Sequence, residues 1–524
     1  MKRSLIIALL CITTLFSLSA FGQKEDISAS FKPPLDVKDT FVIGTIETQD
    51  PLFLDPFEAT DALSQLALNG LFEGLFSFDS HTGEPTLAIA QEVVISDDEL
   101  TWMIYIDPRA RFSNGDTITA QMFIDSWIYL IDNAEYGHGN THLVSLLDCI
   151  EGVIEYRTEY GSRSNIGLKA IAPHILEMRL ITKAPYLSAL LATLPFSAIH
   201  PSTRGGSKKT TITSGPFTLV QQSRQRIVLK KNPWYRNFDE VASDYIEIAF
   251  MKSDELAKAY SRGEVHWSLS FLPLETLSSL SDLHLGPEYS TGFYYFSADS
   301  GPYAKKEVRQ ALSLLVPWDK LRLHSGYIFP TDRFIPDHTN LFTPKYEDQQ
   351  KRTEQAFELL SEAGYPNGEG LPPLYMGIHK GAQVQEVSNA IADIWKKELG
   401  ITVVLDTVSL STYSRYPSLS PYDFAFITWI GDINSPFAFL NLFRSSSGYN
   451  LGRLESDEFD ELVFDALKEP TQANIIAAEN YLLDSGIVIP MFHGMTTNVI
   501  NSSLVMGWYD NELNIHPVHT LQVK

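Results

Sequence analysis

Two kinds of hydrophobic pattern mark the first third of the chain. Residues 40–46 are rich in apolar and β-branched side chains and predict a strand, whereas residues 66–76 have the apolar content of a helix. The segments 92–95 and 101–106 again have the pattern of short strands, and the Asn114–Gly115 pair after them is a turn signal. The sequence therefore predicts a small antiparallel sheet in this region.

A helical pattern follows this sheet. Thr119 is a residue type that caps helices, and Phe123, Trp127, Leu130 and Ile131 recur after it at helical spacing. The pattern predicts an amphipathic helix that begins just after Thr119.

The chain after about residue 285 alternates strand and helix signals. Helices are predicted over residues 354–363 and 384–399, the second ended by Gly400, and strands over residues 374–378 and 401–405. A strand, helix, strand order predicts a right-handed βαβ unit within an open α/β sheet. We therefore expect a mixed lobe first and an α/β lobe later.

The N-terminus has the pattern of a secretory signal peptide. Lys2 and Arg3 precede an apolar run over residues 5–16 that is too short to cross a bilayer comfortably, and small residues lead up to a cleavage site after Gly22. We interpret residues 1–22 as a cleaved leader, so that the mature chain works outside the cytoplasm. An uncleaved anchor helix is the alternative.

The two cysteines of the chain, Cys11 and Cys149, allow no disulfide once the leader is removed. Lipid attachment at Cys11 is disfavoured, because the bulky Leu10 precedes it and the apolar run continues past it. Stability must therefore come from a large core, and 524 residues exceed one ordinary domain, so two or three lobes are expected.

The balance of charge excludes some partners. The chain has 64 Asp and Glu against 40 Lys and Arg, a formal net charge of −24. Nucleic acids and anionic membrane surfaces are themselves negative, so this balance disfavours both.

Catalytic and metal-binding motifs are missing from the sequence. It contains no HExxH, CxxC, Gly-x-Ser-x-Gly or Walker pattern, and its 13 histidines have no ligand spacing. We therefore expect no catalytic residue, no metal and no cofactor. A carboxylate-pair hydrolase leaves no fixed spacing and stays open as an alternative.

Short blocks in a fixed order cover nearly all of the mature chain. They include Leu54-Asp55-Pro56, Leu71-Phe72-Glu73-Gly74-Leu75, Phe112-Ser113-Asn114-Gly115-Asp116, Ser214-Gly215-Pro216-Phe217, Asn232-Pro233-Trp234-Tyr235, Val308-Arg309-Gln310-Ala311-Leu312 and Trp429-Ile430-Gly431-Asp432. In this order they resemble the periplasmic oligopeptide-binding family, the solute-binding proteins of peptide ABC transporters.

The resemblance implies an α/β fold, a two-lobed periplasmic binding protein with a hinge and an additional small third domain. The first lobe would be assembled from residues 23–75, 199–285 and 486–524. The extra domain would comprise residues 76–198, and the second lobe residues 286–485. The predicted βαβ unit falls within this second lobe.

The resemblance also implies a ligand anchor at Asp432. The family places an aspartate three residues after a tryptophan, where it holds the α-ammonium group of the peptide, and Asp432 follows Trp429 at that distance. Thr428, Trp429, Ile430 and Gly431 would form the strand against which an extended peptide lies, which fixes the main chain and leaves side chains unspecified. An enclosed carboxylate and a cation form a strong charge-assisted hydrogen bond. An ordinary turn aspartate is the alternative.

The second rim and the carboxylate end of the ligand are less well defined. The resemblance places Ala62 on the opposite rim, and the adjacent Asp61 is either a further negative charge there or a helix-start carboxylate. Some peptide-binding members have an arginine three residues before the tryptophan, where this chain has Phe426. Without that guanidinium we expect the site to depend less on a ligand carboxylate than on an amine. A substitute clamp at Arg415 and packing of Phe426 in the core remain open.

These observations favour a periplasmic receptor of an ABC importer that captures peptides between closing lobes and delivers them to membrane permease subunits. We expect a monomer that binds a small peptide or peptide-like solute and no nucleic acid. A family receptor for a non-peptide amine or chelated solute, a secreted hydrolase, and a periplasmic holdase or adhesin are the alternatives.

Overall fold

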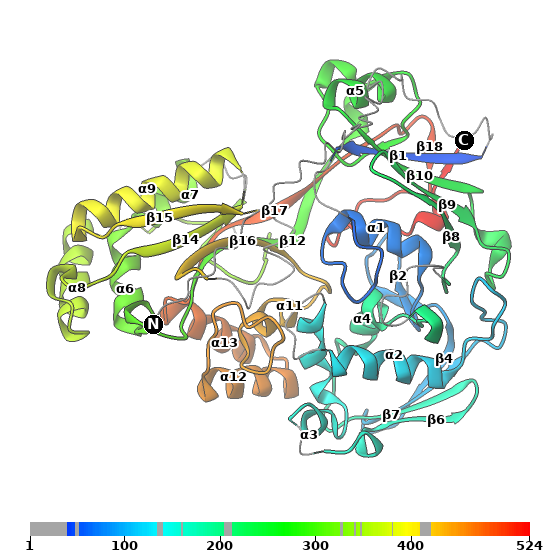
Figure 1. Ribbon diagram of the computed structural model, residues 1–524, viewed down its shortest axis with the longest axis horizontal. Helices are drawn as coiled ribbons and strands as arrows, with labels where there is room; N and C mark the ends of the chain where they lie inside the picture. The colour runs from blue at the N-terminus through cyan, green and yellow to red at the C-terminus, as the bar shows by residue number, and fades with distance from the viewer. Residues whose placement is uncertain are drawn as a thin grey trace, which may run out of the picture. The chain divides into compact units, whose positions relative to one another are not determined.

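Most strands of the chain join one large mixed sheet (Figure 1). In the computed structural model ten of them pair consecutively, and the short β13 (Phe329–Pro330) pairs with β17 off that path. The order is β15 (Val403–Val408), β14 (Leu374–His379), β16 (Phe424–Ile430), β12 (Leu283–Phe296), β17 (Val488–Ile500), β11 (Trp267–Ser268), β1 (Thr40–Ile46), β10 (Tyr245–Met251), β9 (Arg226–Lys231) and β8 (Phe217–Gln222).

The described part of the chain forms one compact unit. It comprises residues 39–47, 52–133, 140–158, 161–203, 212–324, 329–339, 342–345, 348–379, 381–408 and 421–524. The predicted leader, Cys11 and Arg415 lie outside these ranges. None of the described helices is both long enough and apolar enough to cross a membrane.

Two long strands, β12 and β17, connect the two halves of the large sheet. The first part of β12 pairs with the end of β17, and its second part pairs with β16 on one side and the start of β17 on the other. The pairing breaks between Pro287 and Thr291, where three residues of β12 face only Gly494 of β17. This bulge lies where the sheet passes from one half to the other, so β12 and β17 are the hinge strands of a two-lobed fold.

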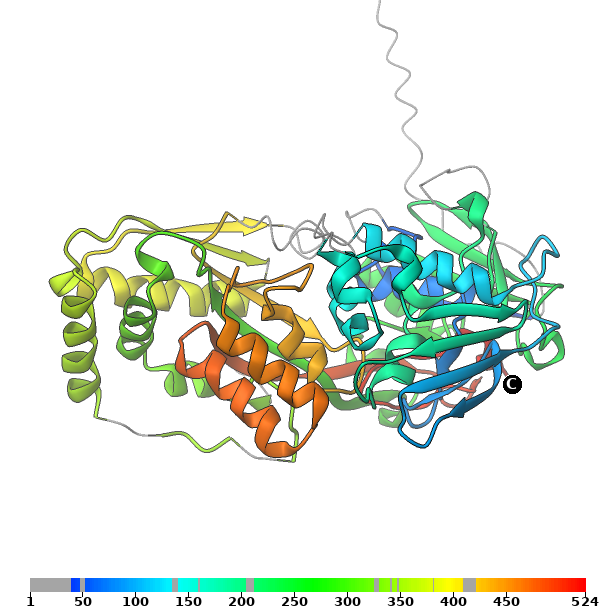
Figure 2. The same ribbon diagram turned by 90° about the horizontal axis from the view of Figure 1, so that it is seen from below.

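The half of the sheet that contains β14, β15 and β16 confirms the predicted βαβ unit. Strands β14 and β15 are parallel neighbours, and α9 (Ala382–Leu399) connects them and ends at Gly400 with a positive φ of 69°. The helices α6 (Lys306–Leu315) and α8 (Gln349–Glu362) complete an apolar core with α9 against these strands. Figure 2 shows α12 (Asp457–Lys468) and α13 (Gln472–Asp484) packed side by side in the same part of the chain.

The predicted small antiparallel sheet is also present. Its order is β4 (Ala90–Ile95), β5 (Thr101–Ile106), β7 (Ile175–Arg179) and β6 (Leu168–Ala172), and α2 (Ala120–Asp132) packs against β6 and β7. Thr119 occupies the N-cap of α2, although its side chain makes no capping hydrogen bond.

The helix predicted over residues 66–76 was misplaced. Helix α1 is Ala62–Leu71, capped by Asp61, whose carboxylate accepts a hydrogen bond from the N–H of Ser64, and the chain turns extended at Phe72. A Cβ at Gly74 would lie 2.8 Å from the carbonyl oxygen of Leu191. The backbone passes so close to its neighbour there that only glycine fits without a shift.

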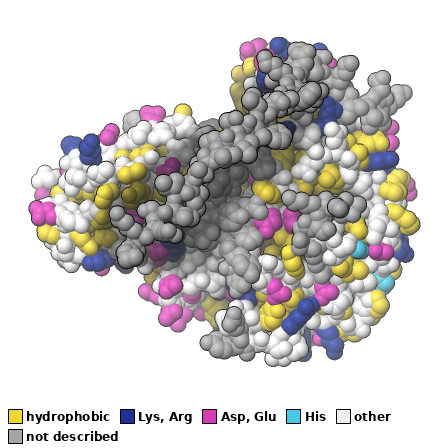
Figure 3. All heavy atoms as spheres, in the orientation of Figure 1, with side chains coloured by type: hydrophobic (Ala, Val, Ile, Leu, Met, Phe, Trp, Pro, Cys, Tyr) yellow, Lys and Arg dark blue, Asp and Glu magenta, His cyan; other side chains and the backbone are white. Residues whose placement is uncertain are grey.

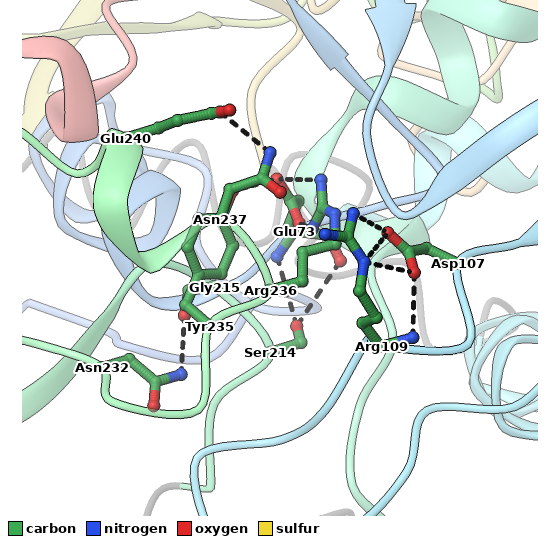
Figure 4. A network of polar contacts seen from close by, with 10 residues as sticks. All are labelled: Glu73, Asp107, Arg109, Ser214, Gly215, Asn232, Tyr235, Arg236, Asn237 and Glu240. Carbon is green, nitrogen blue, oxygen red and sulfur yellow. Dashed lines mark hydrogen bonds and ion pairs between the residues drawn. The ribbon is translucent and has the colours of Figure 1, made fainter.

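A buried polar network lies at the end of α1. Glu73 accepts hydrogen bonds from the hydroxyl of Tyr235 at 2.7 Å and from the guanidinium of Arg236, and Figure 4 shows the Asp107 and Arg109 pair next to it. Residues far apart in sequence are thereby joined where the segment with the small sheet meets the strands β8 to β10. The segment boundaries at residues 75, 198, 285 and 485 remain predictions.

Figure 3 shows charged side chains of both signs on the described surface of one face, with a group of Asp and Glu at its lower left. The chain as a whole has 64 Asp and Glu against 40 Lys and Arg.

Candidate functional site

Strand β16 has one edge that is only partly paired. Strand β12 pairs with the whole of β16, whereas β14 pairs only with Phe424 and Ala425. From Phe426 to Ile430 the second edge of β16 therefore has no strand partner among the described residues. Such an edge presents backbone N–H and C=O groups to which an extended peptide can add as a further strand.

Accessible side chains of β16 occur only at its end. Trp429 is 8% exposed and donates its indole N–H to the carbonyl of Ala438 at 3.0 Å, so it is fixed within the core. Thr428 is half-buried and Ile430 is 40% exposed on the opposite face. The structure thus makes Thr428 and Ile430 accessible and uses Trp429 as a support.

The turn after β16 positions Asp432. The N–H of Gly431 donates to the carbonyl of Tyr289 at 2.8 Å, and a Cβ on Gly431 would lie 2.7 Å from the Tyr289 ring. The side chain of Asp432 is 13% exposed, and its Oδ2 accepts a hydrogen bond from Nε2 of His142 at 2.8 Å. The predicted anchor is therefore a nearly buried carboxylate with one partner in the short helix η2 (Thr141–Cys149).

His142 was not found by sequence reasoning. Its side chain is 3% exposed, and its ring lies 5.0 Å from that of Trp429 and 4.4 Å from that of Tyr449. Burial, together with the charges of Asp432 and Glu58, raises the pKa of Tyr449 well above its usual range. No spacing in the sequence could reveal His142, because its partner is 290 residues away.

The loop before α1 reaches the same place. Asn140, two residues before His142, donates from Nδ2 to the carbonyls of Pro56 and Ala59. Ala62 is exposed in the first turn of α1, and Asp61 is the helix-start carboxylate that was one of its two interpretations.

Phe426 lies in the apolar core of the second lobe. It is 0% exposed and packs against the rings of Tyr294, His379 and Phe492. In this conformation it offers no surface to a ligand. The described residues also contain no group of His, Cys, Asp and Glu that could hold a metal ion.

Further contacts join η2 to the segment that follows Asp432 in the chain. Asn441 donates from Nδ2 to the carbonyl of His142 at 2.6 Å, and its Oδ1 accepts from the hydroxyl of Ser145 at 2.7 Å. Asp148 forms ion pairs with Arg157 at 2.6 Å and with Arg444 at 3.4 Å. The segment of the predicted extra domain is thus joined to the predicted second lobe beside the anchor.

Comparisons with known proteins agree with one another. Residues 84–450 match the model of "Bacterial extracellular solute-binding proteins, family 5 Middle". The periplasmic oligopeptide-binding protein OppA of Salmonella typhimurium is 28% identical over 566 residues, which cover 100% of this chain and 98% of that protein.

Solved structures share the fold. The murein tripeptide binding protein MppA of Escherichia coli has a TM-score of 0.78 at 24% identity, covering 93% of this chain and 99% of that one. Haemophilus influenzae OppA in complex with RPPGFSPFR has a TM-score of 0.78 at 22% identity, with the same coverage.

Proposed function

The chain belongs to family 5 of the bacterial extracellular solute-binding proteins, and from that premise we propose that it is a peptide receptor of an ABC importer. It captures a short peptide between its two lobes and delivers it to membrane permease subunits. OppA of Salmonella typhimurium, which matches over the full length of this chain, is named for oligopeptide binding in the periplasm.

The observation that carries this proposal is the position of Asp432 at the end of β16. An unpaired strand edge and a nearly buried carboxylate lie next to each other, and a peptide with a free N-terminus presents the two complementary groups. The ammonium would bind Asp432, and the main chain would extend past Gly431 and Ile430 towards Thr428. Ala62 is proposed for the opposite rim.

The remaining parts of the proposal follow from the family. The family is one of solute-binding proteins, and we propose that this chain likewise binds its solute without catalysis or a cofactor. We also propose that it works as a monomer. The leader over residues 1–22 would export it to the periplasm.

The test is binding of alanine peptides of three, four and five residues to wild type and to Asp432→Asn. Loss of one partner of a buried charged pair typically costs about 3–5 kcal/mol, so we expect affinity to fall by about two to three and a half orders of magnitude. Asp116→Asn is the control, because Asp116 accepts a hydrogen bond from His200 at 3.0 Å in a similar pair but is exposed. Calorimetry measures affinity, and melting curves confirm the fold.

Near-native affinity of Asp432→Asn would show that this residue is an ordinary turn aspartate. Acetylation of the peptide amine should abolish binding to wild type for the same reason. Equal affinity for the acetylated peptide would remove the amine anchor from the proposal.

A further inference from the structure

The carboxylate proposed to hold the ligand amine already has a partner from another part of the chain. Nε2 of His142 donates to Oδ2 of Asp432 at 2.8 Å, and the two side chains are 3% and 13% exposed. Oδ1 of Asp432 accepts no hydrogen bond from the described residues, so it is available to a ligand. A ligand ammonium at this carboxylate must therefore share it with the imidazole of His142.

Among the described residues, Asp432 is the acidic side chain that pairs directly with His142. Its ring packs between those of Trp429 and Tyr449, and Nδ1 is buried without a hydrogen-bond partner in the described part of the chain. The titratable and charged groups around it are Asp432, Tyr449 and Glu58, which acts on Tyr449. Further along η2 lie one acidic and two basic side chains, Asp148 with Arg157 and Arg444.

A charged imidazole and a ligand ammonium on one carboxylate oppose each other. Two like charges within a few ångströms disfavour the protonated state of the group that can lose its proton, and poor solvation strengthens the effect. A neutral imidazole still donates Nε2–H to Asp432 and leaves the carboxylate its negative charge. The site thus holds a cation best when His142 is neutral.

We propose that His142 makes capture of the ligand amine proton-linked. Asp432 binds the ammonium tightly only when His142 is neutral, so binding releases to solvent any proton that this imidazole holds. This inference rests on the proposed function. His142 is then a specificity-determining residue, since it sets the charge that Asp432 presents to the ligand.

The linkage predicts the pH dependence of affinity. Histidine in general changes its charge between about pH 5 and 8. Affinity for an alanine peptide should rise with pH for as long as His142 holds a proton in the unliganded chain, by at most about tenfold per pH unit for one proton, and level off once the imidazole is neutral.

The experiment is calorimetry of the same alanine peptides at about pH 5.5 and pH 8, near the two ends of that range, in buffers with different ionisation enthalpies. Wild type should release up to one proton at the lower pH and almost none at the higher. His142→Gln keeps an N–H donor for Asp432 but does not titrate, so it should release clearly less at the lower pH. His200→Gln, which alters the exposed pair with Asp116, should behave as wild type.

Equal proton release by wild type and His142→Gln would overturn the inference. A flat pH profile of wild-type affinity would also overturn it, and this measurement needs no variant to fold. Failure of every alanine peptide to bind wild type at both pH values would instead count against the proposed function.

Discussion

Glu247 and Asp432 show how differently this fold holds a single carboxylate. Asp432 keeps a hydrogen bond from His142, whereas Glu247 in β10 is fully buried and neither of its oxygens accepts a hydrogen bond from the described residues. Arg226 lies 3.2 Å from one of these oxygens. Burial nevertheless dominates over this cation and raises the pKa of Glu247 to about 7.

The raised pKa of Glu247 predicts a pH dependence of stability. Between the usual glutamate value and about pH 7 the folded chain keeps this proton while the unfolded chain loses it, so the free energy of unfolding falls as pH rises. The contribution is up to about 3 kcal/mol, at about 1.36 kcal/mol per unit of pKa shift. Melting temperatures of wild type and Glu247→Gln from about pH 5 to pH 8 test it.

The neutral amide of the variant cannot titrate. Glu247→Gln should therefore lose less stability than wild type over this range. Parallel curves for the two proteins would mean that Glu247 keeps its charge in the folded chain.

Sequence reasoning reached some of these residues and missed others for physical reasons. Asp432 was proposed from the resemblance to the oligopeptide-binding family, in which a tryptophan three residues earlier marks the position. His142 is missed because its partner comes from a distant part of the chain, and no local period reports such a contact. Phe426 lies in a run of seven residues in which only Thr428 is polar. A continuous apolar run predicts a buried strand but does not say which of its side chains a ligand could reach.

At the level of secondary structure, the two hinge strands β12 and β17 are interrupted by a bulge in their pairing. Glu288, Tyr289 and Ser290 face Gly494 alone, and a Cβ on Gly494 would lie 1.8 Å from the hydroxyl oxygen of Ser290. The carbonyl of Tyr289 also accepts a hydrogen bond from the N–H of Gly431. The bulge is therefore bonded to the turn that carries Asp432. Neither β12 nor β17 was predicted from the sequence, and the extra residues of a bulge leave no pattern of their own.

A matched pair of substitutions tests this close approach. Gly494→Ala should lower the melting temperature, because the added methyl group overlaps the Ser290 hydroxyl and crowding in a packed site typically costs about 1–3 kcal/mol. Ser290→Ala in the same chain removes that hydroxyl and should recover much of the loss. Additive effects of the two substitutions would show that Gly494 is not limited by Ser290.

At the level of the whole molecule, the sequence predicts the lobes but not the contacts between them. Alternating strands and helices predicted the α/β lobe, since that pattern is local. The ion pairs that join η2 to the segment around Arg444 depend on how distant segments meet. Contacts of this kind contribute to ligand affinity when they form on closure, since a ligand stabilises the state in which they are made.

Arg444→Met tests whether these contacts belong to closure. Arg444 forms an ion pair with Asp148 and donates a hydrogen bond to the carbonyl of Ser145. In the variant, Asp148 retains its ion pair with Arg157. If the contacts form on closure, affinity for an alanine peptide should fall by about tenfold to a hundredfold, equivalent to about 1.4–2.7 kcal/mol, and ligand-free melting should change little. Arg262→Met, which removes an exposed pair with Glu264, should leave both measurements unchanged. A lower melting temperature of the ligand-free variant with unchanged affinity would mean that the contacts are permanent and that hinge motion does not break them.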